Sequence, residues 1–230
     1  MSILIDRSRR IGGHKGLVIP SGCILNLPLF LLDGKSIMSK DHYGHIGTVT
    51  GALWTSQGRY FDGVDDYISA GNNAIFQLVT ALTLELWVKP GAVSGYLCGM
   101  PYTTSWSNPY NAYQVYYDNT NTRLNFNTNS NGTITGAASS APANAWYHVV
   151  YVHRSSGTSW EAYVNTVSYG TSAGGDPSYS GLPKFSIMTR NADSKGEYGQ
   201  GIIGEVRVYN RALTLDEILR NYQMSKWRYV

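Results

Sequence analysis

The sequence is poor in charged residues. Lys, Arg, Asp and Glu make up 14% of its 230 residues and leave a formal net charge of +3, whereas charged residues usually form about a quarter of a globular chain. The basic residues are scattered except at the two ends of the chain, so no continuous basic stripe is present to follow a nucleic-acid backbone. We therefore predict no nucleic-acid partner.

Cysteine is also scarce. The chain has two cysteines, Cys23 and Cys98, which allow either one disulfide or two reduced thiols, and their number does not distinguish these states. For so sparse a pair, reduced thiols are the favoured interpretation.

The chain lacks a long, uninterrupted hydrophobic run. Residues 7–32 resemble a signal peptide in placing basic residues before the apolar stretch LVIPSGCILNLPLFLL, but Pro20, Asn26 and Pro28 interrupt that stretch. No small-x-small cleavage site precedes Asp33, and the run is too short to span a bilayer. We therefore predict no signal peptide, no transmembrane segment and no membrane insertion.

Patterns typical of catalysis are missing as well. No G-x-S-x-G motif occurs, and neither cysteine has a histidine near it in the sequence. A glycosidase needs two carboxyl groups about 5 to 9 Å apart on one surface. Glu85 and Glu161 each stand alone on a strand face, and Arg207 follows Glu205 by two positions, which favours ion pairing. We predict that the protein is not an enzyme.

What the chain does contain is material for β-strands. Its 25 glycines and 18 tyrosines favour strands joined by tight turns. In LTLELWVKP, residues 82–90, Leu82, Leu84, Leu86 and Val88 share one strand face. Residues 146–165 read as a hairpin that turns within RSSGTS, and GIIGEVRVYN, residues 201–210, reads as a further strand.

One helix is well signalled. Thr214 and Glu217 form the capping box T-x-x-E at the start of a helical pattern. Many short strands followed by one short helix predict an all-β fold, a two-sheet antiparallel β-sandwich or jelly roll with one short C-terminal helix. We expect one such domain over residues 21–224, an N-terminal arm over residues 1–20 and a C-terminal tail over residues 225–230.

Several stretches match one family in the order in which that family has them. These are LNLPL (25–29), GTVTGALW (47–54), YFDGVDDYI (60–68), LTLELWVKP (82–90), WYHVVYV (146–152), AYVN (162–165) and GEVRVYNRALTLDEI (204–218). The set resembles the laminin G-like jelly rolls of the concanavalin A-like lectin and glucanase superfamily and covers roughly residues 23–223. The resemblance implies the fold but no particular activity, because such folds host lectins, adhesion modules, glycosidases and structural parts.

The stretch YFDGVDDYI has two interpretations. Asp62 and Gly63 predict a hairpin turn, with Phe61 and Tyr67 anchoring the strands on either side. The resemblance implies the second interpretation, because some family members bind Ca²⁺ at an edge of the sandwich. In that case Asp62 would bind calcium together with Asn191 or Asp193. We expect no obligatory cofactor, and calcium is the one candidate.

The tyrosine-rich tract at residues 96–117 also has two interpretations. Aromatic faces stack on sugar rings and amide side chains bind hydroxyl groups, which predicts a glycan site formed by Tyr102, Trp106, Asn108, Tyr110 and Asn111. Large amphipathic rings are equally typical of subunit interfaces, and both interpretations stay open. Tyr113 and Val115 are expected to pack in the core.

Glu85 and Arg207 lie in two family-like strands. We predict that they pair across neighbouring strands and stabilise the fold as a structural clamp.

A lectin-like domain without a leader, with a possible docking arm at each end, fits a part of a virus or phage particle. We expect a non-catalytic structural or adhesion protein on the virion surface that packs against copies of itself or other virion proteins and binds host glycans. The alternative is an extracellular lectin, secreted or held at the cell surface without a leader. A divergent glycoside hydrolase ranks third.

Overall fold

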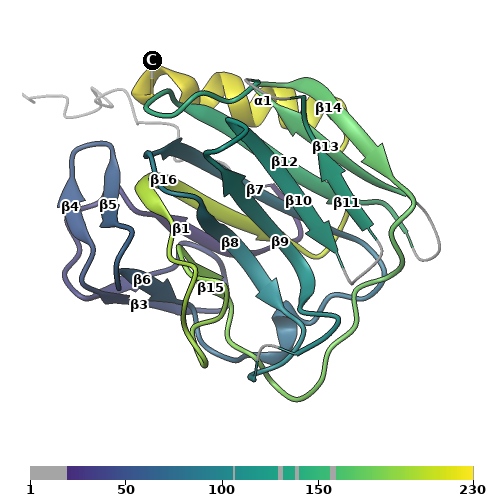
Figure 1. Ribbon diagram of the computed structural model, residues 1–230, viewed down its shortest axis with the longest axis horizontal. Helices are drawn as coiled ribbons and strands as arrows, with labels where there is room; N and C mark the ends of the chain where they lie inside the picture. Colours follow the sequence, from purple (N-terminus) through teal and green to yellow (C-terminus); the bar gives the residue numbers. More distant parts are fainter. Residues whose placement is uncertain (1–19, 106, 129–131, 138–139, 156–158, 230) are drawn as a thin grey trace, which may run out of the picture.

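The computed structural model describes residues 20–229, apart from residues 106, 129–131, 138–139 and 156–158. In this part of the chain, sixteen strands form two antiparallel sheets, and the α-helix follows the last strand (Figure 1). The predicted β-sandwich with a short C-terminal helix is therefore confirmed. Except for Pro20, the predicted N-terminal arm lies outside the described residues.

The first sheet holds eight strands in the order β14-β13-β12-β7-β16-β5-β4, and β1 also pairs with β16. Its strands are β1 (Cys23–Pro28), β4 (Leu53–Thr55), β5 (Gly58–Asp62), β7 (Leu82–Pro90), β12 (Tyr147–His153), β13 (Trp160–Val164), β14 (Val167–Ser172) and β16 (Gln200–Tyr209). The expected hairpin at residues 146–165 is present as β12 and β13.

The second sheet also holds eight strands, in the order β11-β10-β9-β8-β15-β6-β3-β2. Its strands are β2 (Ser36–Met38), β3 (Ile46–Thr50), β6 (Tyr67–Ser69), β8 (Gly95–Pro101), β9 (Asn111–Asp118), β10 (Arg123–Thr128), β11 (Gly132–Thr135) and β15 (Ser186–Ile187). A single 3-10 turn, η1 (Ala74–Phe76), precedes β7.

The core lies between the two sheets because alternate side chains of each strand point inward. In β7, the four aliphatic side chains of the predicted face are fully buried. Tyr113 and Val115 on β9 belong to the same hydrophobic cluster, which confirms that they are core residues.

The helix α1 (Leu215–Ser225) begins at the predicted capping box. The Thr214 hydroxyl accepts a hydrogen bond from the Glu217 amide at 3.3 Å, and the Glu217 carboxylate accepts one from the Thr214 amide at 2.9 Å. The helix packs on the outward face of the first sheet, where the Trp87 indole donates to the Ser225 hydroxyl at 2.9 Å.

Residues 225–229, the described part of the tail expected at 225–230, pack against the sheet and do not form a separate segment. The 3-10 turn η2 (Lys226–Arg228) follows α1 directly, and the ring of Tyr229 stacks on that of Trp87 with centroids 4.6 Å apart. Tyr229 is 2% exposed. Its aromatic side chain makes this segment part of the sandwich.

The hairpin predicted at Asp62 and Gly63 is wrong. Strand β5 pairs with β16 in the first sheet, whereas β6 pairs with β3 and β15 in the second. The turn at residues 63–66 therefore carries the chain from one sheet to the other. Its sequence is that of a tight turn, and Gly63 has φ +82°, but a local turn sequence does not determine which partners the flanking strands find.

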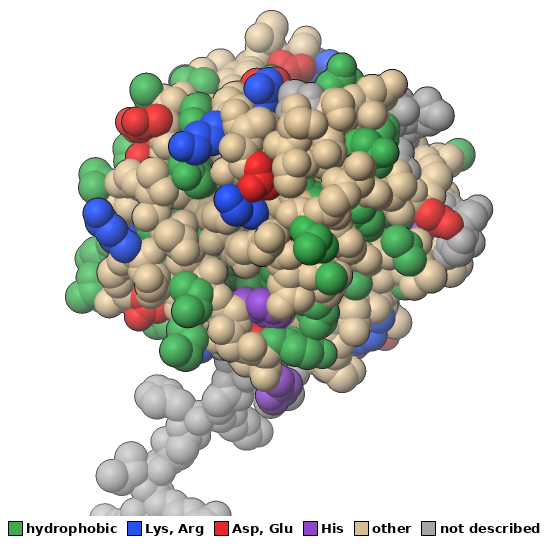
Figure 2. Space-filling model, turned by 90° about the horizontal axis from the view of Figure 1, so that it is seen from below, with side chains coloured by type: hydrophobic (Ala, Val, Ile, Leu, Met, Phe, Trp, Pro, Cys, Tyr) green, Lys and Arg blue, Asp and Glu red, His purple; other side chains and the backbone are tan. Residues whose placement is uncertain are grey.

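The surface reflects the low charge content. On the face shown in Figure 2, the described basic and acidic side chains are scattered among neutral ones, and several of them lie beside a side chain of opposite charge. Among the described residues, no helix is both long and apolar enough to cross a membrane.

Candidate functional site

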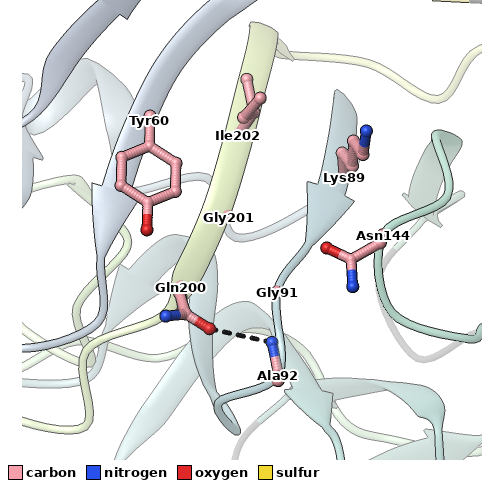
Figure 3. A pocket seen from close by; sticks show the side chains of 8 residues that line it. All are labelled: Tyr60, Lys89, Gly91, Ala92, Asn144, Gln200, Gly201 and Ile202. Atoms are coloured by element: carbon pink, nitrogen blue, oxygen red, sulfur yellow. Dashed lines mark hydrogen bonds between the residues drawn. The ribbon is translucent and has the colours of Figure 1, made fainter.

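A pocket of about 330 Å³ opens on the outward face of the first sheet, near the adjoining ends of β5, β16 and β7 (Figure 3). It is lined by Tyr60, Lys89, Gly91, Ala92, Asn144, Gln200, Gly201 and Ile202. Its volume is at the lower end of the range typical of small-ligand sites.

The pairing of three strands brings these residues together. Tyr60 lies opposite Ile202 in register, and Ile202 lies opposite Lys89. Residues in register on adjacent strands share a face of the sheet, so these three side chains form a row across β5, β16 and β7 (Figure 3). Asn144 joins the row from the loop before β12, because its backbone amide donates to the Pro90 carbonyl at 2.7 Å.

Two glycines allow the backbone to approach closely here. A Cβ on Gly201, which has φ +132°, would lie 2.2 Å from the Lys89 carbonyl oxygen. A Cβ on Gly91 would lie 2.6 Å from Oε1 of Gln200. A larger residue at Gly201 would collide with backbone, so glycine preserves the strand pairing there, whereas a larger residue at Gly91 would displace the Gln200 side chain from the pocket.

The polar groups of the pocket fall into two kinds. The Gln200 amide is fixed, because its Oε1 accepts from the Ala92 amide at 2.9 Å and its Nε2 donates to the Asp62 carbonyl at 3.3 Å. The Lys89 ammonium, the Asn144 side-chain amide and the Tyr60 hydroxyl make no hydrogen bond or ion pair with other described residues. These three groups remain available to a ligand.

An acidic turn, formed by Asp62, Asp65 and Asp66, lies next to the pocket. Asp62 is opposite the pocket residue Gln200 in register. Carboxylate oxygens of Asp62, Asp65 and Asp66 all lie within 4.8 Å of one another. Burial raises the pKa of Asp66, the Asp62 backbone amide lowers it, and the neighbouring carboxylates of Asp62 and Asp65 raise it again, with a net rise. Such a cluster can share a proton or offer oxygen ligands to a hard cation.

The residues predicted to complete a calcium site with Asp62 are engaged elsewhere. Asn191 is fully buried, with its Nδ2 donating to the Thr103 carbonyl at 2.7 Å and its Oδ1 accepting from the Asp193 amide at 2.8 Å. The Asp193 carboxylate pairs with Lys184 at 3.0 Å. Among the described residues, Asp62 gathers instead with Asp65 and Asp66.

The described residues predicted to bind glycans lie in β9 of the second sheet or in the loop before it, whereas the pocket lies on the first sheet. Tyr102, Asn108 and Tyr110 belong to the loop between β8 and β9, where the Tyr102 amide donates to the Tyr110 carbonyl at 2.8 Å. Tyr110 is 45% exposed. Asn111 is buried and hydrogen-bonded to Tyr96, so it does not face solvent as expected. Trp106 lies outside the described residues.

Glu85 and Arg207 face each other in register on β7 and β16, with the nearest charged atoms 3.6 Å apart. The Glu85 carboxylate also receives His148 Nε2 at 2.8 Å, the Tyr209 hydroxyl at 3.0 Å and the Asn221 amide at 2.9 Å. These contacts lie beneath α1, and the hydrogen bond from Asn221 connects the helix to the sheet. The clamp role predicted for the pair stays a prediction.

The sequence gives no local signal for the pocket. Tyr60, Lys89, Asn144 and Gln200 come from four separated segments and follow no spacing typical of a site. The pairing of β5 and β7 with β16 brings Tyr60, Lys89 and Gln200 together, and the hydrogen bond of Asn144 to Pro90 adds the fourth. An exposed tyrosine and lysine in alternating strands are otherwise ordinary surface residues.

Comparison with known proteins identifies the fold. The family model of the concanavalin A-like lectin/glucanases superfamily matches residues 62–219. This confirms the predicted resemblance. No curated protein matches the chain.

Solved structures with the same fold include an enzyme and a toxin domain. Trypanosoma rangeli sialidase in complex with sialic acid superposes with a TM-score of 0.67 at 18% identity, covering 91% of this chain and 34% of the sialidase. The receptor-binding domain of botulinum neurotoxin C/D mosaic serotype superposes with a TM-score of 0.63 at 10% identity, covering 89% and 51% of the respective chains. The chain thus spans about a third of the sialidase, and at these identities the likeness shows the fold alone.

The prediction that the protein is not an enzyme is contradicted. The structural matches include sialidases, so the fold occurs in glycoside hydrolases as well as in lectins. The exclusion relied on carboxylates that stand apart in the sequence. Asp62, Asp65 and Asp66, which lie within five positions of one another in the sequence, do meet at one turn.

Proposed function

Because the chain belongs to the concanavalin A-like lectin/glucanases superfamily, we propose that it is a carbohydrate-binding jelly roll that serves in adhesion. The pocket on the first sheet is the observation that carries this proposal. It combines the Tyr60 ring, the apolar side chain of Ile202 and three polar groups that are not bonded to other described residues. An aromatic face with a few convergent hydrogen-bonding groups is typical of a small-ligand site.

A glycan array tests the proposal directly. We expect the purified protein to bind a subset of the array, and Tyr60→Ala to lower the affinity on the order of tenfold through loss of ring contact. Tyr43→Ala is the matched control, because Tyr43 is 55% exposed and does not line the pocket. Binding that survives Tyr60→Ala unchanged would locate any glycan site elsewhere.

Calcium is proposed as an optional cofactor of the acidic turn, because hard cations prefer carboxylate oxygens. The array is therefore run with and without a chelator, and Asp66→Asn replaces the innermost carboxylate of the turn. If calcium supports binding, the chelator and the substitution weaken it to the same extent. If neither has an effect, calcium plays no part in the site.

Display on a virus or phage particle, in contact with copies of the chain or with other virion proteins, is the finer form of the proposal. It is supported by two exposed tryptophans near Phe30, Trp54 at 41% and Trp227 at 67% exposed, which are linked through the Phe30 carbonyl and the Arg228 guanidinium. Exposed apolar groups that lie close together are typical of interaction surfaces. An extracellular or cell-surface lectin is the alternative, and it predicts a protein that binds glycans without assembling.

A further inference from the structure

The charge of the pocket lining is of one sign. Of its eight lining residues, Lys89 carries a positive charge at neutral pH and none carries a negative one. Within the described part of the chain, the Lys89 ammonium has no acidic partner. A half-buried cation without a counter-charge favours an anionic group that can reach it.

The other polar groups of the lining suit the same ligand. The Asn144 amide and the Tyr60 hydroxyl can each donate a hydrogen bond, and the Asn144 and Lys89 side chains lie on the same side of the pocket (Figure 3). A carboxylate accepts hydrogen bonds only and offers two oxygens to such donors, and charge-assisted bonds are about twice as strong as neutral ones.

The apolar part of the lining suits a sugar ring. Tyr60 and Ile202 are neighbours across β5 and β16, so the phenol ring and the isoleucine side chain together form the apolar part of the row that ends at Lys89. A pyranose ring has an apolar face that packs on such a surface, and its substituents extend from its rim toward the flanking donors.

We propose that the pocket selects a sugar that carries a carboxylate, which is bound by Lys89 and Asn144 while its ring packs on Tyr60. This inference rests on the proposed function, because it specifies which sugars the same pocket prefers.

The acidic turn acts against this preference. Asp65 is exposed, and its carboxylate lies within 4.8 Å of those of Asp62 and Asp66 beside the pocket. Their field repels an anionic ligand, and salt screens it as it screens the attraction of Lys89. Removing the charge of Asp65 therefore strengthens the binding of an acidic sugar and leaves that of a neutral sugar unchanged.

The test measures binding to immobilised sugars that differ in pairs by the presence of a carboxylate. The panel contains a glucuronide, a galacturonide and a sialoside, each beside its carboxyl-reduced counterpart. The native protein is expected to bind at least one acidic member about tenfold more tightly than its reduced form. Lys89→Gln should bring this affinity ratio close to one, with both the acidic and the reduced sugar still bound weakly. Asp65→Asn should increase the ratio.

The controls separate folding from recognition. Lys35→Gln removes an exposed lysine that does not line the pocket, so it should leave the ratio unchanged. Each variant is used only if its unfolding midpoint matches that of the native protein. Equal binding of acidic and reduced sugars that Tyr60→Ala abolishes would overturn this inference and leave the proposed function standing. Binding of no sugar in the panel or on the wider array would overturn both.

Discussion

At the scale of single residues, the strongest interactions surround a buried carboxylate. Glu85 is 2% exposed and accepts hydrogen bonds from side chains on β12, β16 and α1. Burial alone raises the pKa of Glu85, but the Arg207 guanidinium and His148 more than offset this and lower it to about 2. The carboxylate is therefore ionised and held by its partners, and removing it leaves Arg207 buried with less compensation.

We expect Glu85→Ala to lower the free energy of unfolding by about 3 to 5 kcal/mol, because it breaks a buried ion pair and leaves donors unpaired. Urea denaturation measures this change. Glu161→Ala is the control, since Glu161 pairs with Arg154 at the surface, where such pairs contribute about 0 to 1 kcal/mol. Equal losses for the two variants would contradict the structural role of Glu85.

The lowered pKa of Glu85 also predicts how stability depends on pH. A carboxyl group whose pKa is lower in the folded state stabilises the protein above its unfolded pKa, here 4.5, and this contribution is lost as the pH falls toward about 2. We expect Glu85 to account for about 3 kcal/mol of the stability lost between pH 5 and pH 2. Chemical denaturation at a series of pH values should give a shallower decline for Glu85→Gln than for the native protein. Parallel curves would show that the charge of Glu85 is not linked to folding.

The two thiols give a further prediction. Both cysteines are free and buried, and burial raises the pKa of Cys23 to about 12 and that of Cys98 as well. The thiolate is the reactive form, so a disulfide-exchange reagent at pH 8 should label neither cysteine in the folded protein and both in denaturant. Failure to label the denatured chain without a reductant would instead indicate a disulfide.

At the scale of elements, alternation and capping were sufficient to locate β7, the β12–β13 hairpin and α1, because each has a pattern contained within its own residues. The turn after Asp62 was misassigned because the pairing of β5 and β6 depends on β16, β3 and β15, which lie elsewhere in the chain. The pocket was missed for the same reason. Its residues share a face only through register, and the sequence does not specify register between distant strands.

The contact between α1, η2 and the sheet depends on a glycine. A Cβ at Gly204 would lie 2.3 Å from the ring of Tyr229. We expect Gly204→Ala to displace Tyr229 from Trp87 and to lower the free energy of unfolding by about 1 to 3 kcal/mol. Denaturation followed by tryptophan fluorescence reports both effects.

Gly34→Ala is the matched control, because nothing lies within 4 Å of a Cβ at Gly34, and a change within about 0.5 kcal/mol is expected. If Gly204→Ala has no larger effect than this control, the C-terminal segment is not held against the sheet.

At the scale of the whole molecule, the two sheets enclose one core, and two exposed tryptophans, Trp54 and Trp227, lie in the edge strand β4 and in the C-terminal turn η2. The Trp54 indole donates to the Phe30 carbonyl at 3.1 Å, and the Arg228 guanidinium lies 3.6 Å from the centre of the Phe30 ring and 4.5 Å from that of Trp227. Trp54 therefore contacts Phe30 directly, and Arg228 contacts the rings of both Phe30 and Trp227. An edge strand beside such a surface can pair with another chain, and the exposed rings favour that contact.

If the protein assembles through this surface, light scattering on the purified chain should give a mass of at least about twice the 25.3 kDa of one chain. Replacing Trp54 and Trp227 together with serine should return it to the monomer mass, because the apolar area that favours association is lost. Replacing the exposed Val167 on β14 with serine is the control, since it lies on the opposite edge strand of the same sheet. A monomer mass for the native chain at all concentrations would contradict assembly and favour a lectin that acts as a single domain.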